Sequence, residues 1–333
     1  MNNKILLKIV LLYFIFFTIL QINSIVCAAG TAGLTNNWMY NIRNRNSGKY
    51  LNVNYGIDAN GTNVNQYTYD GSNEQKFTLD SMGGDRQYRL YAYCSETRVL
   101  DVYRPLQNNA NVDIWTHDDN DAQIWKIENL GNGYYSIKLA YDTNLALTAY
   151  GTENGGGSGK TSTSPGNVFV STYTGATNQQ WSFERTTALL DWDLVNSNKH
   201  MYWTGSTNYM TEFSAAVSTW NGIIPGLISE THVMAEKVTI FDFYEENTNV
   251  VGQTSSSGTI KFNSYFMNNY HTSLKQNVCV HELGHALRLD HVREPGSVMY
   301  YSVTSTTTPS TNDRWNLLQA YSSGLLAIVV YLC

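Results

Sequence analysis

Charge is scarce in this chain, and what there is leans acidic. Charged residues make up 14% of the 333 residues, against about 25% in ordinary soluble domains. The formal net charge is −6, so the chain lacks the basic excess of a nucleic-acid binder and we expect no nucleic-acid partner. Hydrophobic residues reach 42%, which is enough apolar material to exclude wholesale disorder. The length favours about two domains.

Long apolar runs are also missing. Neither the run at residues 9–17 nor the one at residues 325–333 reaches the roughly 20 residues that span a bilayer, so we expect no stable membrane span. The first run follows two lysines and leads into small residues, which is typical of a secretory signal peptide. We therefore expect residues 1–29 to be cleaved near Ala28 or Ala29 and the mature protein to be secreted and extracellular. The sequence suggests no function for the apolar tail at residues 322–333.

Cysteine is too sparse for a disulfide framework. Removal of the signal peptide would leave Cys94, Cys279 and Cys333, an odd and scattered set, so we expect buried thiols or a free end. Cys27 would suit a lipoprotein anchor, but Val26 stands where such a site needs a small residue. We therefore do not expect lipid attachment.

What the sequence does contain is a threefold repeat in its first half. Each copy has an Asn-Val pair followed, twelve residues after the Asn, by Gln-x-aromatic, and all three copies align without a gap over this stretch. The copies begin at Asn63, Asn111 and Asn167 and end at Gln75–Phe77, Gln123–Trp125 and Gln179–Trp181. Upstream, each copy carries a Leu-x-apolar strand, which we place at Leu51–Val53, Leu100–Val102 and Leu145–Leu147. Three copies of short strands predict an all-β domain with pseudo-threefold symmetry.

This repeat resembles the ricin-type β-trefoil lectin domain, over about residues 36–185. The resemblance implies a carbohydrate or glycoprotein partner, held by an Asp after the Leu, a stacking aromatic and a polar pair before the Trp. A flat aromatic suits the C–H face of a sugar ring, while the hydroxyls need fixed polar partners. The candidate residues are Asp101, Trp115 and Gln123 in the second copy and Asn52, Tyr67 and Gln75 in the first. The third copy has Ala146 and Ser171 at these places and should bind no sugar.

Three of these assignments have a structural alternative. The Gln of each Gln-x-aromatic motif can hydrogen-bond within its own copy, and we weight Gln75 and Gln123 towards that role. Trp115 could also be a plain surface aromatic.

The second half has a different pattern, joined through a short link at residues 186–190. Apolar residues of the stretch 211–220 share one helical face, and residues 238–243 and 258–262 have the composition of strands. Another helix follows, for which Ser273 and Gln276 form a capping-box start. Pro309–Asp313 begins a last helix through Tyr321. Mixed helices and strands predict an α+β or α/β unit, so the whole chain is expected to be multidomain, an all-β trefoil followed by an α+β domain.

The helix after residue 273 carries a metal-binding pattern. His281 and His285 are one turn apart, so their imidazoles project from the same face and can hold one ion. Glu282 lies beside them and can take a proton from water. His291 supplies a third imidazole if the helix stops after Leu287 and the chain turns back. Three neutral imidazoles leave a tetrahedral zinc one open position.

The motif resembles the metzincin zinc peptidases, closest to the matrixin branch, over about residues 190–321. The resemblance implies one catalytic Zn²⁺ held by His281, His285 and His291, Glu282 as the general base, and Met299 in Ser297-Val298-Met299-Tyr300 as the Met-turn. It also implies protein or peptide substrates, with residues 258–262 as the edge strand that would hold them. Tyr301 stands where the related astacin branch has a tyrosine near the metal, which makes it a candidate transition-state stabiliser. The sequence indicates no structural Ca²⁺ site.

Two alternatives limit this assignment. A gluzincin would need a distant carboxylate ligand, and Asp313, the only acid beyond Glu294, does not match one. Arg288 stands where the family has a glycine, whose positive φ lets the helix end and the third ligand swing back. The sequence therefore predicts a secreted zinc endopeptidase directed to glycans, with a lectin or adhesin bearing an inactive peptidase-like domain as the alternative.

Overall fold

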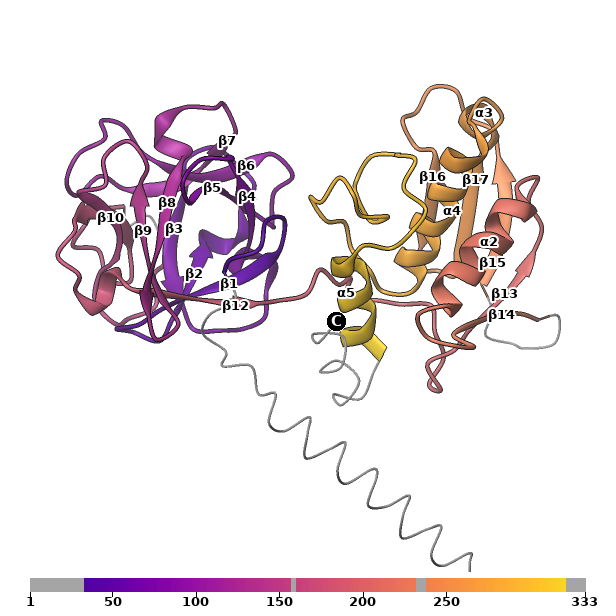
Figure 1. Ribbon diagram of the computed structural model, residues 1–333, viewed down its shortest axis with the longest axis horizontal. Helices are drawn as coiled ribbons and strands as arrows, with labels where there is room; N and C mark the ends of the chain where they lie inside the picture. Colours follow the sequence, from indigo (N-terminus) through magenta and orange to yellow (C-terminus); the bar gives the residue numbers. More distant parts are fainter. Residues whose placement is uncertain (1–32, 157–159, 232–237, 322–333) are drawn as a thin grey trace, which may run out of the picture. The chain divides into compact units, whose positions relative to one another are not determined.

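The computed structural model describes residues 33–156, 160–231 and 238–321 (Figure 1). The predicted signal peptide and the apolar tail lie outside these residues. The chain forms two compact units that divide at about residue 185, with short segments near residues 37–40 and 77–80 grouped with the second. Within the described residues, no helix is long and apolar enough to cross a membrane. Cys94 and Cys279 are both free thiols there.

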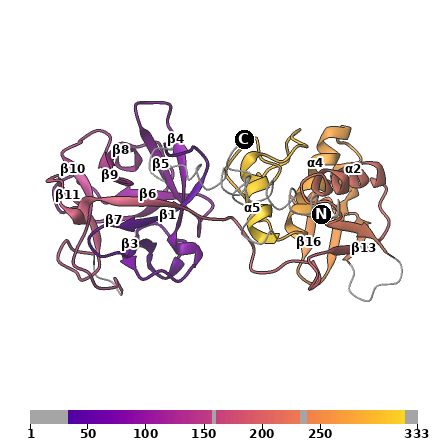
Figure 2. The same ribbon diagram turned by 60° about the horizontal axis from the view of Figure 1, so that its bottom comes forward.

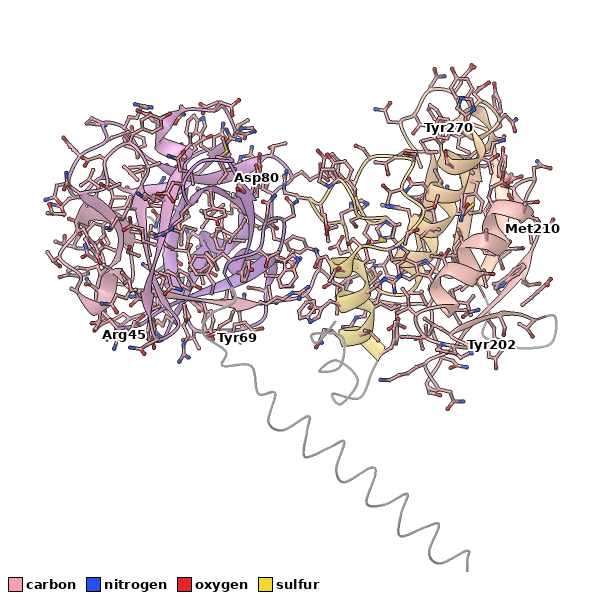
Figure 3. The ribbon with its side chains drawn as sticks, viewed as in Figure 1. Arg45, Tyr69, Asp80, Tyr202, Met210 and Tyr270 are labelled. Atoms are coloured by element: carbon pink, nitrogen blue, oxygen red, sulfur yellow. The ribbon has the colours of Figure 1, made fainter. Side chains whose placement is uncertain are left out.

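The first unit is an all-β trefoil built from antiparallel strands that curl into a barrel (Figures 1 and 2). Single 3-10 turns connect some of them, and polar and aromatic side chains such as Arg45 and Tyr69 cover the outside (Figure 3). The strands are β1 (Met39–Asn44), β2 (Tyr50–Val53), β3 (Thr62–Tyr67), β4 (Lys76–Ser81), β5 (Gln87–Ala92), β6 (Arg98–Val102), β7 (Val112–Thr116), β8 (Trp125–Gly131), β9 (Tyr134–Leu139), β10 (Leu145–Ala149), β11 (Val168–Thr172) and β12 (Trp181–Arg185).

The three copies of the repeat are three equivalent hairpins, β2–β3, β6–β7 and β10–β11. Leu51 pairs with Gln66 and Leu100 with Ile114, and the matching pair in the third hairpin is Leu147 with Val170. The expectation that Leu145 opens the Leu-x-apolar strand of the third copy was therefore wrong by two residues, because Leu147 holds that place. Strand alternation has a period of two, so Leu145 and Leu147 fit the pattern equally well and only the pairing separates them.

The Gln-x-aromatic motif holds each copy together from inside. The side chains of Gln75, Gln123 and Gln179 are buried, and each Nε2 donates to a backbone carbonyl, at 2.9, 3.0 and 3.0 Å. Each Oε1 accepts a backbone N–H five residues upstream. The indole N–H groups of Trp125 and Trp181 donate to the carbonyls of Leu100 and Leu147, both at 3.0 Å. The structural role expected for the glutamines is what their contacts show.

A ring of three asparagines joins the copies at the centre. The Nδ2 of Asn63 donates to Asn167, that of Asn167 to Asn111 and that of Asn111 to Asn63, at 2.8–2.9 Å. All three residues are buried. Because a buried amide left without a partner is costly, the closed ring fixes the register of all three copies at once.

The second unit is an α+β domain with one mixed sheet and two long helices lying side by side (Figures 1 and 2). The sheet order is β14-β13-β15-β17-β16, parallel except for β16. The elements are β13 (Met201–Gly205), α2 (Met210–Asn221), β14 (Ile228–Glu230), β15 (Val238–Phe243), β16 (Gly252–Ser255), β17 (Thr259–Asn263), α3 (Ser264–Met267), α4 (Thr272–Ala286) and α5 (Thr311–Tyr321).

Two local expectations for this unit were wrong. The strand predicted at residues 258–262 is β17, which lies inside the sheet, and the edge strand on that side is β16. Helix α4 starts at Thr272 with His271 at its N-cap, without a side-chain cap, so Ser273 and Gln276 do not form a capping box. Both errors come from local patterns that carry no information about which strand is outermost or where tertiary contacts begin a helix.

Candidate zinc and catalytic site

Helix α4 carries two of the three candidate ligands, and packing against α2 fixes it. Trp220 of α2 is fully buried, and its indole N–H donates to the carbonyl of Val280 at 3.0 Å. This contact sits one residue before His281 and involves a carbonyl on the buried side of the helix. The histidines are therefore presented from a rigid element, which a metal site requires.

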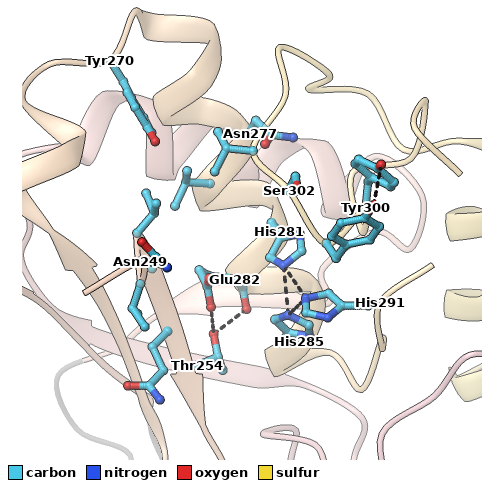
Figure 4. A pocket seen from close by; sticks show the side chains of 17 residues that line it. Asn249, Thr254, Tyr270, Asn277, His281, Glu282, His285, His291, Tyr300 and Ser302 are labelled. Atoms are coloured by element: carbon cyan, nitrogen blue, oxygen red, sulfur yellow. Dashed lines mark hydrogen bonds between the residues drawn. The ribbon is translucent and has the colours of Figure 1, made fainter. Parts of the chain in front are cut away.

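His281, His285 and His291 come together as the sequence predicts. Their three Nε2 atoms form a triangle with sides of 3.0, 3.1 and 3.2 Å (Figure 4). Two nitrogens bound to one tetrahedral zinc at ~2.0–2.1 Å would lie about 3.3 Å apart, so the triangle fits one ion. In the part of the chain that the structure describes, this is the one cluster of three or more His, Cys, Asp or Glu side chains with metal-binding geometry.

The protonation of the histidines also suits a metal. The Nδ1 atoms of His281 and His285 lie 2.8 and 2.9 Å from the carbonyls of Val298 and Leu289, which can only accept, so Nδ1 carries the proton and Nε2 offers its lone pair. Burial and the neighbouring histidines hold the pKa of His281 well below its usual range. Burial, with His291 beside it, lowers the pKa of His285 to about 4. Two neutral imidazoles that aim lone pairs at one point, with the Nε2 atom of His291 beside them, are a ligand set for a cation.

Arg288 takes the backbone conformation that the family glycine would take. Its φ is +74°, and α4 ends in a Schellman motif in which Arg288 N–H donates to His285 and Leu289 N–H to Gly284, both at 2.9 Å. Leu190 holds the strained residue, since its N–H donates to the Arg288 carbonyl at 2.8 Å and its carbonyl accepts from Arg288 Nε at 3.0 Å. The segment predicted as a link thus supports the turn, and Arg288 does not prevent His291 from reaching the other two histidines.

Met299 lies directly against the helix between the first two histidines. A Cβ on Gly284 would stand 2.3 Å from the Met299 sulfur, so only glycine leaves room for this side chain. The buried Asp313 holds the turn, because its carboxylate accepts from Ser297 Oγ and from Val298 N–H, the latter at 3.0 Å. Asp313 is therefore a support of the turn and not a ligand. Sequence reasoning missed this role, although Ser310 and Asp313 form the capping pair of α5.

Glu282 lies beside the histidines, at 5% exposure. Its Oε2 accepts from Thr254 Oγ1 at 2.7 Å (Figure 4). Burial raises the pKa of Glu282 to about 7, and the hydrogen bonds from Thr254 oppose this rise. A carboxylate poised near neutrality is suited to general-base chemistry.

A pocket of about 660 Å³ opens over these residues. Its walls are β16 with the preceding loop, helix α4 between Asn277 and His285, and the chain after Met299. Tyr270 and Asn277 line the part of the pocket that is uppermost in Figure 4. The side chain of Asn277 holds the chain after Met299 in place. It accepts a hydrogen bond from Thr304 N–H at 3.0 Å and donates one to the Thr306 carbonyl at 2.6 Å. Tyr301 lines the pocket and is 55% exposed, and its hydroxyl accepts from Tyr300 at 3.0 Å.

The candidate sugar residues lie on two of the three hairpins. Asp101 pairs with Asp113 across β6–β7, and alternation puts Trp115 on the same face. Trp115 is 39% exposed, Asp101 is 7% exposed, and Gln123 is buried against the turn. In the first copy Asn52 is buried, its Nδ2 donating to Asn65 at 3.0 Å, while Tyr67 is partly exposed and Gln75 is buried.

Asp113 is the residue that sequence reasoning overlooked. It is 1% exposed, and its Oδ1 has no hydrogen-bond partner. Burial and the charge of Asp101 raise the pKa of Asp113 to about 7, while burial raises that of Asp101 to about 6, opposed by a hydrogen bond from Gln123. The alignment of the repeats could have identified Asp113, because the first copy has another polar residue, Asn65, at the equivalent position.

Comparison with known proteins agrees with this architecture. Residues 31–115 and 103–159 match the family of ricin-type beta-trefoil lectin domain-like sequences, which defines the first half as lectin-like. Residues 180–322 match the matrixin family. The chain therefore consists of a ricin-type β-trefoil lectin domain followed by a matrixin metallopeptidase domain with a three-histidine triad.

Three similar solved structures each align with less than half of this chain. The designed threefold-symmetric protein ThreeFoil is 31% identical, over 44% of this chain and 99% of its own, with a TM-score of 0.40. The Rhizoctonia solani agglutinin is 22% identical, over 46% and 98%, with a TM-score of 0.40. The Macrolepiota procera ricin B-like lectin, solved with lactose, is 17% identical, over 46% and 100%, with a TM-score of 0.37. No curated protein matches the chain.

Proposed function

We propose that the mature chain is a secreted zinc endopeptidase that cleaves extracellular proteins and is directed to glycans or glycoproteins by its lectin domain. The observation that carries the catalytic part is the triangle of Nε2 atoms, with two of its histidines held in the ligand tautomer. His281, His285 and His291 would hold the ion. Bound zinc would supply a Lewis acid that polarises the peptide carbonyl and makes water easier to deprotonate.

The chain's own groups would carry the proton. Glu282 lies beside the histidines, so its carboxylate takes a proton from the attacking water and later gives it to the leaving amine. Burial keeps bulk water from this carboxylate and brings its pKa near neutral, where it can both accept and release a proton. Met299 supports the triad from below, and Tyr301 at the pocket rim is a candidate stabiliser of the developing oxyanion.

The trefoil would supply the targeting. The exposed ring of Trp115 would stack on a sugar, and Asp101, held by Gln123, would accept hydroxyl hydrogen bonds. Tyr67 and Asn52 form a second, weaker candidate site. Because Gln75 and Gln123 are buried, their part is to hold the site residues and the turns rather than to touch sugar. A tethered lectin raises the local concentration of glycosylated substrate around the peptidase.

The inactive-peptidase alternative rested on Arg288. The positive φ of Arg288 and the place of His291 in the triad argue against that reason for inactivity.

Cleavage of fluorescently labelled casein by the purified mature chain tests the catalytic proposal. We expect cleavage that a zinc chelator stops and that Glu282→Ala lowers by at least a thousandfold, while the exposed Glu246→Ala on the same domain leaves the rate unchanged. Activity that survives both chelation and Glu282→Ala would overturn the proposal.

Binding to a glycan array tests the lectin proposal. Trp115→Ala and Asp101→Ala should abolish binding, whereas Tyr141→Ala, which removes another exposed aromatic of the same domain, should not. Loss of binding in all three variants, or in none, would refute the assigned site.

A further inference from the structure

The edge strand β16 presents two adjacent same-face residues to the carboxylate of Glu282. Alternation along a strand puts Gly252 and Thr254 on one face, with Gln253 on the other. Their partners on β17, Phe262 and Ile260, are buried, so this shared face is the one turned towards the core and α4.

Thr254 contacts Glu282 twice. Its hydroxyl lies 2.7 Å from Glu282 Oε2 and 2.8 Å from the Glu282 main-chain carbonyl, so its single proton is shared between these two acceptors (Figure 4). The carbonyl anchors the hydroxyl on the helix, and the carboxylate oxygen is thereby tied to the strand. One side chain thus connects the strand that borders the pocket to the residue proposed as the base.

Gly252 closes the other side of the carboxyl group. A Cβ at this position would stand 2.8 Å from Glu282 Oε1 and 2.9 Å from its Cγ. The strand therefore fits the glutamate closely because position 252 has no side chain. Together the two residues leave the carboxyl group little freedom to rotate.

We propose that Thr254 is a positioning residue for the peptidase reaction, whose hydroxyl holds the Glu282 carboxylate in the orientation in which it receives the proton of the attacking water. This inference rests on the proposed peptidase function. The Thr254 hydroxyl keeps its own proton throughout, and the transferred proton moves from water to Glu282 and then to the leaving amine. Without the hydroxyl the carboxylate would rotate among several orientations, of which a fraction would be productive.

The test compares Thr254→Val, which removes the hydroxyl at nearly constant volume, with Thr254→Ser, which keeps it. We expect Thr254→Val to lower kcat on labelled casein about tenfold, the effect of one charge-assisted hydrogen bond, with KM unchanged. Thr254→Ser should restore most of kcat. Thr239→Val, at an exposed threonine of β15, should behave as the parent protein.

Zinc content and melting temperature separate positioning from a general structural role. Zinc content should be unchanged in Thr254→Val, and the melting temperature should fall only by the few degrees that one lost hydrogen bond costs. A crystal structure of this variant should show the Glu282 carboxylate displaced from its position in the parent protein. The inference is overturned if kcat is unchanged, if Ser is no better than Val, if zinc is lost or the peptidase domain is unfolded at the assay temperature, or if the carboxylate stays in place. A parent protein without zinc or cleavage would instead refute the proposed function itself.

Discussion

The buried carboxyl pair of the second hairpin makes the stability of the trefoil depend on pH. Asp113 and Asp101 face each other across β6–β7, and the pKa of Asp113 is raised to about 7 from an unfolded value near 3.9. Asp118 and Asp121 add negative charge near Asp101, while Arg104 opposes it, and the charge of Lys160 lowers the pKa of Asp113. The folded state therefore holds its proton more tightly than the unfolded state.

The sign of the effect follows from this difference. The contribution of Asp113 to the free energy of unfolding is most favourable at low pH, where the carboxyl is protonated in both the folded and the unfolded state. This contribution falls as the pH rises from about 4 to about 7. A rise of about three pKa units corresponds to about 4 kcal/mol at the upper limit, and relaxation around the pair reduces it to roughly 2–4 kcal/mol. The equivalent pair of the first copy is Asn52 and Asn65. These two side chains carry no charge and are joined by a hydrogen bond at 3.0 Å, so their burial does not depend on pH.

Asp113→Asn should copy that arrangement. We expect the free energy of unfolding of the trefoil to rise by about 2–3 kcal/mol at pH 8, or roughly 5–10 °C in melting temperature, and to change little at pH 4. Scanning calorimetry of the mature protein at both pH values measures this, with the trefoil transition recognised as the one that a zinc chelator leaves unmoved. Asp85→Asn, at an exposed carboxylate, is the control. An equal gain at pH 4 and pH 8, or a loss at pH 8, would refute the reasoning.

Three further substitutions test the contacts that support the zinc site of the second domain and the symmetry of the trefoil. Arg288→Gly relieves the positive φ but removes the bond to Leu190, so stability should change by less than about 1 kcal/mol in a denaturant titration, with zinc content retained. Gly284→Ala must displace Met299, and we expect a loss of several kcal/mol and weaker zinc binding in a chelator competition. Asn111→Ala breaks the ring with Asn63 and Asn167 and should cost the trefoil about 2–4 kcal/mol by calorimetry. An unchanged melting temperature in the last variant would mean that water replaces the lost amide.

Local motifs made much of this molecule predictable. The Gln-x-aromatic triplets predicted the trefoil correctly, because each glutamine and each tryptophan makes the same internal hydrogen bonds within its own copy. The ligands His281 and His285 followed from helical spacing, and His291 from the need for a turn after Leu287. These features depend on residues close in sequence, so a single sequence is enough to find them.

Features that depend on pairing across the chain were not predictable in the same way. Leu145 and Leu147 satisfy the same alternation, and only the register with β11 shows which one is equivalent to Leu100. The short, polar β16 has no apolar pattern, so its place at the sheet edge and the contact of Thr254 with Glu282 emerge only in three dimensions. Likewise, the role of Asp313 at the Met299 turn joins residues from separate elements.

The metal content of the mature protein tests the central claim most directly. After dialysis against metal-free buffer, the parent chain should retain about one zinc per molecule by plasma mass spectrometry, and His291→Ala should retain almost none while its trefoil transition is unchanged. A parent chain without zinc, or a His291→Ala variant that binds as much zinc as the parent, would contradict the three-histidine site.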